Sequence, residues 1–194
     1  MERARRRSKK DSKGLGIFKG RLPDRNDLFI VLSVILFAVF SWSIRGFLFI
    51  FPSILMRYAT VELMGIFSYM MAFATVESLL LFVGLVLTSM LLPRRWLREG
   101  FSYKGFLIVL VGSVSAIQYQ TFLGKELPEK NVFFLWAGMA IAIAVALCVL
   151  SHFVHRLQDI LVSIAERFTV FAFLYIPLGI LGLAVVAFRN IFKG

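Results

Sequence analysis

Two charged residues, Arg45 and Glu77, lie within long apolar stretches of this 194-residue sequence. Arg45 ends an uncharged run from Leu28 to Ile44, and Glu77 interrupts the apolar stretch from Leu63 to Leu92. Counted at 1.5 Å per residue from the inner ends of these stretches, the two residues lie roughly 27 Å and 24 Å deep. Ionisable groups at such depth are costly and often mark ion pathways or binding sites. We therefore expect Arg45 and Glu77 to form an intramembrane charge pair. In the alternative, Arg45 extends to the headgroups while Glu77 is protonated or hydrogen-bonded.

His152 and His155 are three residues apart, so a helix would place both imidazoles on one face. This spacing suits a metal or a haem, although a polar rim beside Arg156 and Asp159 explains it equally simply. No Cys and His cluster has the spacing of a structural zinc site, and the single Cys148 cannot form a disulfide within the chain. No cofactor is expected.

Polar and small residues mark two further faces. A polar triplet near the end of the third apolar stretch would line a cavity or face the lipid–water interface: Gln118, Tyr119 and Gln120. Three small residues four apart form a stripe in the fourth stretch: Gly138, Ala142 and Ala146. Such stripes suit close packing between membrane helices.

The composition indicates that these residues lie in a lipid bilayer. Apolar residues make up 59% of the chain and charged residues only 17%, against about 45–50% and about 25% in soluble domains. The mean hydropathy is +0.83. We expect an all-α membrane protein, a polytopic bundle of about five transmembrane helices that fills residues 27–194 as one domain. The expected spans are residues 28–50, 63–92, 105–123, 131–154 and 168–188.

Two segments between these spans are less regular. The apolar stretch Gly46 to Met56 contains Pro52 and is too short to cross a bilayer alone, so it either extends the first helix or lies at the interface. We favour the extension. Residues Arg156 to Arg167 have a periodic apolar face, which predicts a short amphipathic helix on the inner membrane surface. Its four apolar residues are Leu157, Ile160, Leu161 and Ile164.

The distribution of basic residues predicts orientation. Residues 1–26 contain ten Lys or Arg and too little apolar surface to fold alone, so we expect a disordered cytoplasmic tail that binds anionic headgroups. With the N-terminus inside, 16 of the 22 Lys and Arg lie on the inner side of the five spans. This agrees with the positive-inside rule and predicts a multi-pass cell-membrane protein. No cleavage site for a signal peptide follows the first apolar run. The tail lacks interleaved aromatic residues, so nucleic acid is not an expected partner.

The sequence lacks the motifs of intramembrane enzymes. It has no His-Glu-x-x-His run, no pair of intramembrane aspartates, no Gly-x-Ser-x-Gly elbow and no Gly-rich phosphate loop. We therefore favour a non-catalytic role as a scaffold, an accessory subunit or a membrane anchor, with a protein partner or further copies of the chain. The alternative is an oligomeric transporter or channel protomer in which Glu77 is the ion or proton group.

Overall fold

The computed structural model describes residues 24–91, 100–123, 130–153 and 155–193. Within these ranges the chain forms helices and no strand, which confirms the all-α class. Five stretches are long and apolar enough to cross a membrane, the last of them running through two successive helices, Arg156–Phe192. The helices are α2 (Arg25–Leu55), α3 (Thr60–Leu91), α5 (Phe101–Leu123), α6 (Lys130–Phe153), α7 (His155–Arg167) and α8 (Thr169–Lys193). The predicted tail lies outside the described residues except for its last three.

The segment around Pro52 is part of helix α2. Asp24 caps the helix by accepting a hydrogen bond from the backbone N–H of Arg25 at 2.8 Å, and the helix continues through Pro52 to Leu55. The favoured extension is thus confirmed. At 31 residues the helix is about 46 Å long, which exceeds the roughly 30 Å of hydrocarbon. A helix of that length must tilt or protrude.

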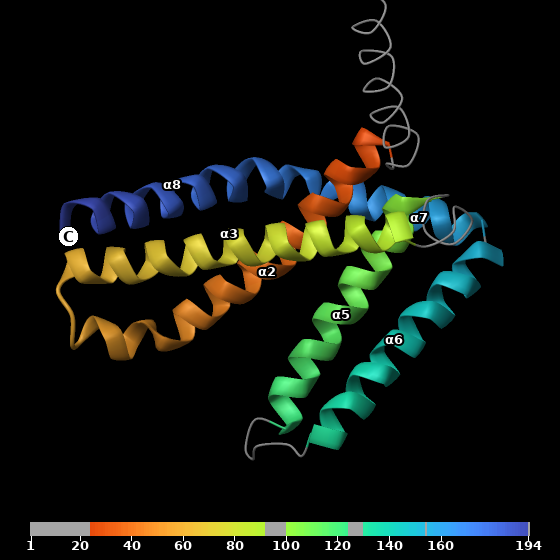
Figure 1. Cartoon of the computed structure of the whole chain (residues 1–194), viewed down its shortest axis with the longest axis horizontal. Helices are drawn as coiled ribbons and strands as arrows, with labels where there is room; N and C mark the ends of the chain where they lie inside the picture. The colour runs from red at the N-terminus through yellow and green to blue at the C-terminus, as the bar shows by residue number, and fades with distance from the viewer. Residues whose placement is uncertain (1–23, 92–99, 124–129, 154, 194) are drawn as a thin grey trace, which may run out of the picture.

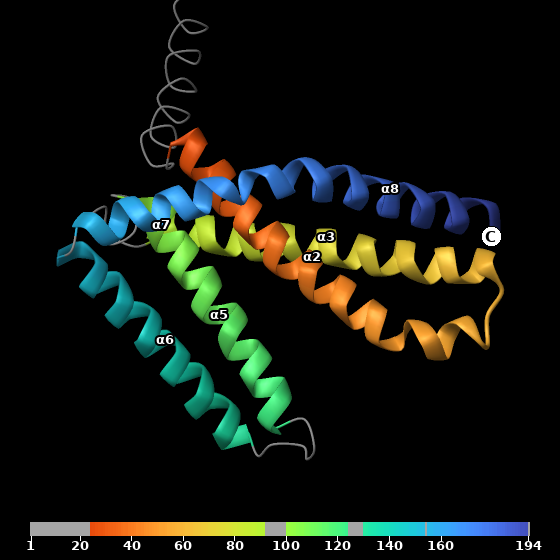
Figure 2. The same cartoon turned by 180° about the vertical axis from the view of Figure 1, so that it is seen from behind.

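The helices form a three-helix bundle and a hairpin of α5 and α6, which is attached to the bundle where α5 begins against α2 (Figures 1 and 2). Helices α2, α3 and α8 pack against one another, while α6 packs mainly against α5 and α7. The starts of α2 and α5, the ends of α3 and α6, and α7 gather at one end of the molecule. The turn between α2 and α3 and the end of α8 lie at the other end. We call these the α7 end and the turn end.

Small residues bring α3 and α8 close together. A Cβ atom added at Gly182 would lie 3.0 Å from both the backbone nitrogen of Ala72 and the carbonyl oxygen of Ser68. At Gly179 an added Cβ would overlap the side chain of Thr75. Glycine is therefore required at this interface for close approach, as in other tightly packed membrane helices.

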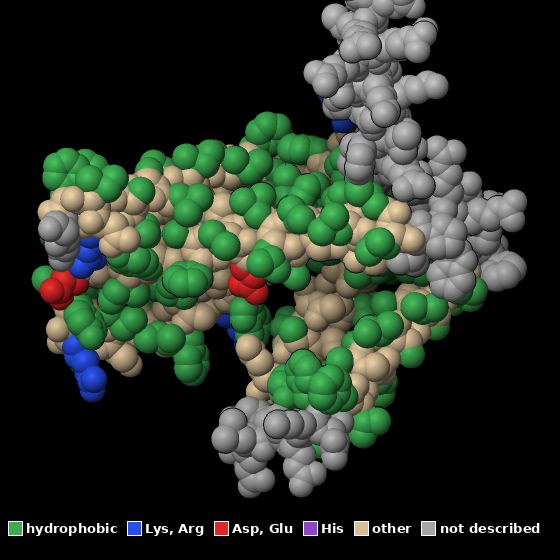
Figure 3. All heavy atoms as spheres, in the orientation of Figure 1, with side chains coloured by type: hydrophobic (Ala, Val, Ile, Leu, Met, Phe, Trp, Pro, Cys, Tyr) green, Lys and Arg blue, Asp and Glu red, His purple; other side chains and the backbone are tan. Residues whose placement is uncertain are grey.

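Helix α5 diverges from α2 after its first turns. A Cβ atom at Gly105 would lie 2.6 Å from the side chain of Val31 on α2, whereas one at Gly112 would have nothing within 4 Å. Seven residues are about two turns, so both glycines lie on the same face of α5. The hairpin of α5 and α6 consequently leans away from the bundle, and Figure 3 shows the surface indented between them.

A helix, α7, covers the segment predicted to be amphipathic, and its apolar residues are divided between the protein core and the open surface. Ala165 is fully buried and Leu161 packs against the core, whereas Ile160 and Ile164 are 55% and 40% exposed. The reason is that α5, α6 and α2 pack against part of α7 and leave the side with Ile160 and Ile164 open. Two of the four predicted apolar residues therefore face away from the protein.

Candidate functional site

A hollow between α2 and α3, which we call the α2–α3 hollow, collects polar side chains at membrane depth. Its lining residues are Ser43, Ile66, Tyr69, Met70, Phe73, Ala74 and Glu77. Six of them come from α3 at spacings of three, four or seven residues, so they share one face of that helix. Ser43 comes from the adjacent face of α2. Buried Ala74 forms part of the floor, and Phe73, which is 74% exposed, forms part of the rim.

The polar groups of this hollow have no partner among the described residues. No hydrogen bond or ion pair to another described group involves the hydroxyls of Ser43 and Tyr69 or the carboxyl of Glu77. Neighbouring hydroxyls on α3 behave differently: Thr75 and Ser78 donate to carbonyl oxygens one turn earlier, at 2.8 Å and 2.7 Å. Polar groups without partners are costly in an apolar medium, so this hollow is the strongest candidate site.

Glu77 carries the charge of the hollow. It lies 17 residues after the first residue of α3 and 14 before the last, or about 26 Å and about 21 Å from the helix ends. Its side chain is exposed. A carboxylate at the centre of a spanning helix costs roughly 2.5–3.5 kcal/mol on insertion scales. A favourable place for the Glu77 carboxyl in a membrane therefore depends on a partner beyond the residues that the structure describes.

Arg45 lies near this site but is not among the residues that line the hollow. It follows Ser43 by two residues, which places it about 200° around α2. Its guanidinium lies 5.1 Å from the centre of the Trp42 ring, and its side chain is exposed. No ion pair within 4.0 Å joins the described side chains of Arg45 and Glu77. The expected pair is not formed in this structure and stays a prediction.

The predicted polar triplet does not gather in one place. Gln118 and Gln120 are exposed, while the half-buried Tyr119 ring lies 5.7 Å from Phe133 and 6.4 Å from Trp136. Tyr119 thus helps to hold α5 against α6.

The predicted small-residue stripe lies on the open side of α6. Its three residues, Gly138, Ala142 and Ala146, are all exposed. The side that meets α5 carries Trp136, whose ring N–H donates to the hydroxyl of Ser115 at 3.0 Å. No residue from 132 to 150 is buried. Close packing through this stripe does not occur among the described helices, and Gly179 and Gly182 perform that role on α8 instead.

The predicted pair of histidines falls outside the described part of the structure, which includes neither the side chain of His152 nor that of His155. Among the described residues, no three His, Cys, Asp or Glu side chains are grouped so as to hold a metal ion.

A buried polar cluster at the α7 end was not predicted from the sequence. The Ser102 hydroxyl donates to a carboxylate oxygen of Asp27 at 2.5 Å, and Gln158 donates to the carbonyl oxygen of Ser151 at 2.8 Å. Lys104 is only 4% exposed, and its ammonium lies 5.4 Å from the centre of the Tyr103 ring. The predicted spans leave Lys104 in the loop before residue 105, whereas the structure places it in the first turn of α5. The cluster joins the hairpin to the bundle where α2, α5, α6 and α7 meet.

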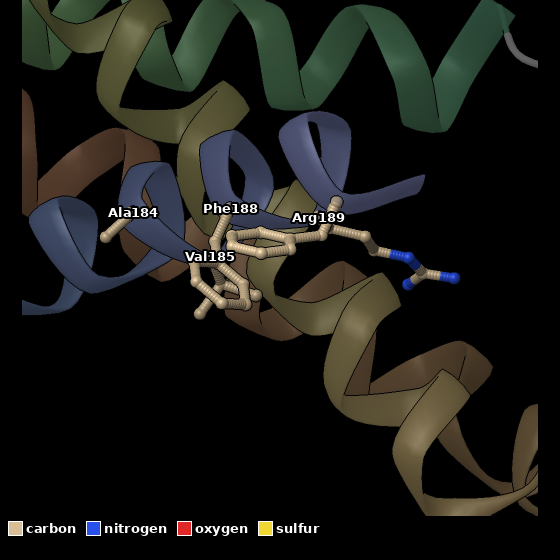
Figure 4. A pocket seen from close by; sticks show the side chains of 5 residues that line it. Ala184, Val185, Phe188 and Arg189 are labelled. Atoms are coloured by element: carbon tan, nitrogen blue, oxygen red, sulfur yellow. The ribbon is translucent and has the colours of Figure 1, made fainter. Parts of the chain in front are cut away.

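A second hollow, near the turn end of α8, is almost wholly apolar (Figure 4). It is lined by Ala184, Val185, Phe188, Arg189 and Phe192. The figure shows the Arg189 side chain extending away from Val185 and Phe188, and its guanidinium occupies the space beside Gly65 on α3. Arg189 thus packs between α8 and α3. The other residues that line this hollow are apolar and cannot bind a polar ligand or catalyse a reaction.

Comparisons with protein-family models, with curated proteins and with solved structures find no match for this chain. Function must therefore be argued from the site itself.

Proposed function

We propose that this chain is a non-catalytic subunit of a larger membrane assembly, acting as a scaffold, an accessory subunit or an anchor for a partner. The observation that carries the proposal is the α2–α3 hollow, in which Glu77, Ser43 and Tyr69 lack partners among the described residues. Lipid tails cannot supply hydrogen-bond donors or acceptors to such groups. A neighbouring protein surface can.

Helix α6 supports the same proposal. It exposes a face with three small residues in a row and has no buried residue from 132 to 150. Faces of this composition allow a second helix to approach closely. The chain thus offers two surfaces for association, one polar and one apolar.

In this proposal the α7 end faces the cytoplasm of a multi-pass cell-membrane protein. The end of α3 and the start of α5, which flank the expected cytoplasmic loop, lie at that end. The basic tail binds anionic headgroups there. The open side of α7, with Ile160 and Ile164, lies against lipid at the inner surface.

A transporter or channel protomer is the second candidate function. It is favoured by the position of Glu77 halfway along α3, in a hollow with two free hydroxyls, since carboxylates at such depth serve proton and ion pathways. In this case the hollow binds a proton or a cation rather than a protein group.

Two measurements on the full chain separate these functions. Extraction from the host membrane into polymer nanodiscs should yield a complex larger than one chain, and proteoliposomes should show no proton or cation flux above empty vesicles. Flux that is lost in Glu77→Gln but kept in Glu62→Gln would favour the transporter. Glu62 is a matched control because it is exposed at the start of α3, away from the hollow.

A further inference from the structure

The α2–α3 hollow presents hydrogen-bond acceptors without a matching cation. Glu77 supplies two carboxylate oxygens, and Ser43 and Tyr69 each supply a hydroxyl. None of the three makes a hydrogen bond or an ion pair within the described part of the chain. A cationic side chain with several N–H donors matches such a set, since hydrogen bonds to charged groups are about twice as strong as those between neutral groups. Lys and Arg have this chemistry.

The hollow opens sideways from the bundle. Phe73 at its rim is 74% exposed, the Glu77 side chain is exposed, and buried Ala74 closes the hollow on the inside. Because Glu77 is about 26 Å and about 21 Å from the two ends of α3, a group that reaches its carboxyl lies within the apolar layer of the bilayer. A helix satisfies its own backbone hydrogen bonds in that layer. The element that delivers the cationic group is therefore a transmembrane helix.

The face of α3 that carries Glu77 leaves room for such a helix. Gly84 lies about two turns after Glu77 on the same face, and it is exposed. A Cβ atom added at Gly84 would meet nothing within 4 Å, and the same is true at Gly46, one turn after Ser43 on α2. Glycines with open space above them allow a second helix to approach closely. A partner helix along this face would thus pass directly over the hollow.

We propose that the α2–α3 hollow binds a Lys or Arg side chain from the middle of a partner protein's transmembrane helix, which lies along the exposed face of α3. This inference rests on the proposed function and specifies the chemistry of the partner. The ion pair neutralises the Glu77 carboxylate, and the hydroxyls of Ser43 and Tyr69 accept further hydrogen bonds. The partner is stabilised equally, because its own basic group is costly at that depth.

Model transmembrane peptides test this pairing. The probe is a Leu- and Ala-rich peptide of about 24 residues with one Lys at its centre, and the matched peptides carry Leu or Glu there. Energy transfer between each labelled peptide and the labelled full chain in lipid vesicles reports association. We expect the Lys peptide to bind about ten-fold more tightly than the Leu peptide. The Glu peptide should bind no better than the Leu peptide.

Variants of the chain show whether the pairing occurs in the hollow. Glu77→Gln should abolish the preference for the Lys peptide, whereas Glu62→Gln should keep it, because Glu62 is exposed at the start of α3. Glu77→Lys should reverse the preference, so that the Glu peptide binds more tightly than the Lys peptide. A role of Glu77 in folding alone predicts no such reversal.

Gly84→Val tests the path of the partner helix. Its added side chain lies on the face that the peptide occupies, so binding of the Lys peptide should weaken by about five-fold or more. Gly138→Val is the matched control, because a Cβ atom at Gly138 on α6 also has nothing within 4 Å. Equal binding to the two variants would overturn the proposed path along α3.

Two results would overturn the proposed pairing. One is equal binding of the Lys and Leu peptides to the wild-type chain. The other is a preference for Lys that survives in Glu77→Gln, since the basic group would then bind elsewhere. In either case a complex larger than one chain in nanodiscs would leave the subunit function standing. A single chain in nanodiscs would instead refute that function, whatever the peptides do.

Discussion

Glu77 differs in position from the other acidic residues that the structure describes. The others lie at helix starts or in the short α7: Asp24, Asp27, Glu62, Asp159 and Glu166. Acids at helix starts are stabilised by the helix dipole and by water. Glu77 lies 17 residues from the start of its helix, and neither it nor its two hydroxyl neighbours has a partner among the described residues. The hollow is therefore interpreted as a site and not as ordinary surface.

Gly182 tests the close contact of α3 and α8. Gly182→Val should destabilise the folded protein by about 1–3 kcal/mol, because the added side chain meets the backbone of α3 and overpacks the interface. The measurement is the free energy of unfolding in mixed micelles. Gly84→Val is the matched control, since a Cβ atom at Gly84 has nothing within 4 Å. Equal losses in the two variants would show that the contact at Gly182 is not tight.

Ser102 tests the buried cluster at the α7 end. Ser102→Ala should cost about 1–3 kcal/mol of stability, because it removes the hydroxyl that donates to Asp27. Ser113→Ala serves as the reference, as Ser113 lies further along α5 and makes no hydrogen bond to another described group. A thermal melt in detergent compares the two. Indistinguishable melting temperatures would mean that water replaces Ser102 as the donor.

At the scale of helices, apolar run length was enough to predict the spans. Each of the five predicted spans overlaps an observed helix, and the ends differ by a few residues. Run length carries no information about which faces meet. The stripe of Gly138, Ala142 and Ala146 has the right spacing but no partner helix, whereas Gly179 and Gly182 have one. Run length also places Lys104 in a loop, since the third apolar stretch begins after it. Its burial depends on the packing of the first turns of α5 against α2, which run length does not reveal.

Helix α7 gives a prediction for a whole element. Spin labels at Leu161 and Ala165 should be immobile and buried in protein, while labels at Ile160 and Ile164 should be accessible to lipid-soluble oxygen. The physical reason is that α5, α6 and α2 pack against only part of the surface of α7. Accessibility to water-soluble nickel reagents at all four positions would contradict both the packing and the interfacial placement.

At the scale of the whole molecule, the paths of the helices predict topology. The loop between α5 and α6 should face outside, because three spans separate it from the N-terminus, which the positive-inside rule predicts to be cytoplasmic. Leu127→Cys in a Cys148→Ser background should react with a membrane-impermeant maleimide added to intact cells. Reaction only after the inner face is exposed would reverse the orientation. It would leave the helix packing unchanged.

The central claim is that protein covers the α2–α3 hollow in the membrane. Phe73 forms its rim and is 74% exposed, and Phe173 on α8 is 75% exposed and lies outside the hollow. A photoreactive phenylalanine analogue incorporated at each position in turn, in the native membrane, reports the neighbour directly. We predict cross-links from position 73 to protein, shown by mass spectrometry and a shifted gel band, and cross-links from position 173 mainly to lipid. Cross-links from position 73 to lipid alone would contradict the account.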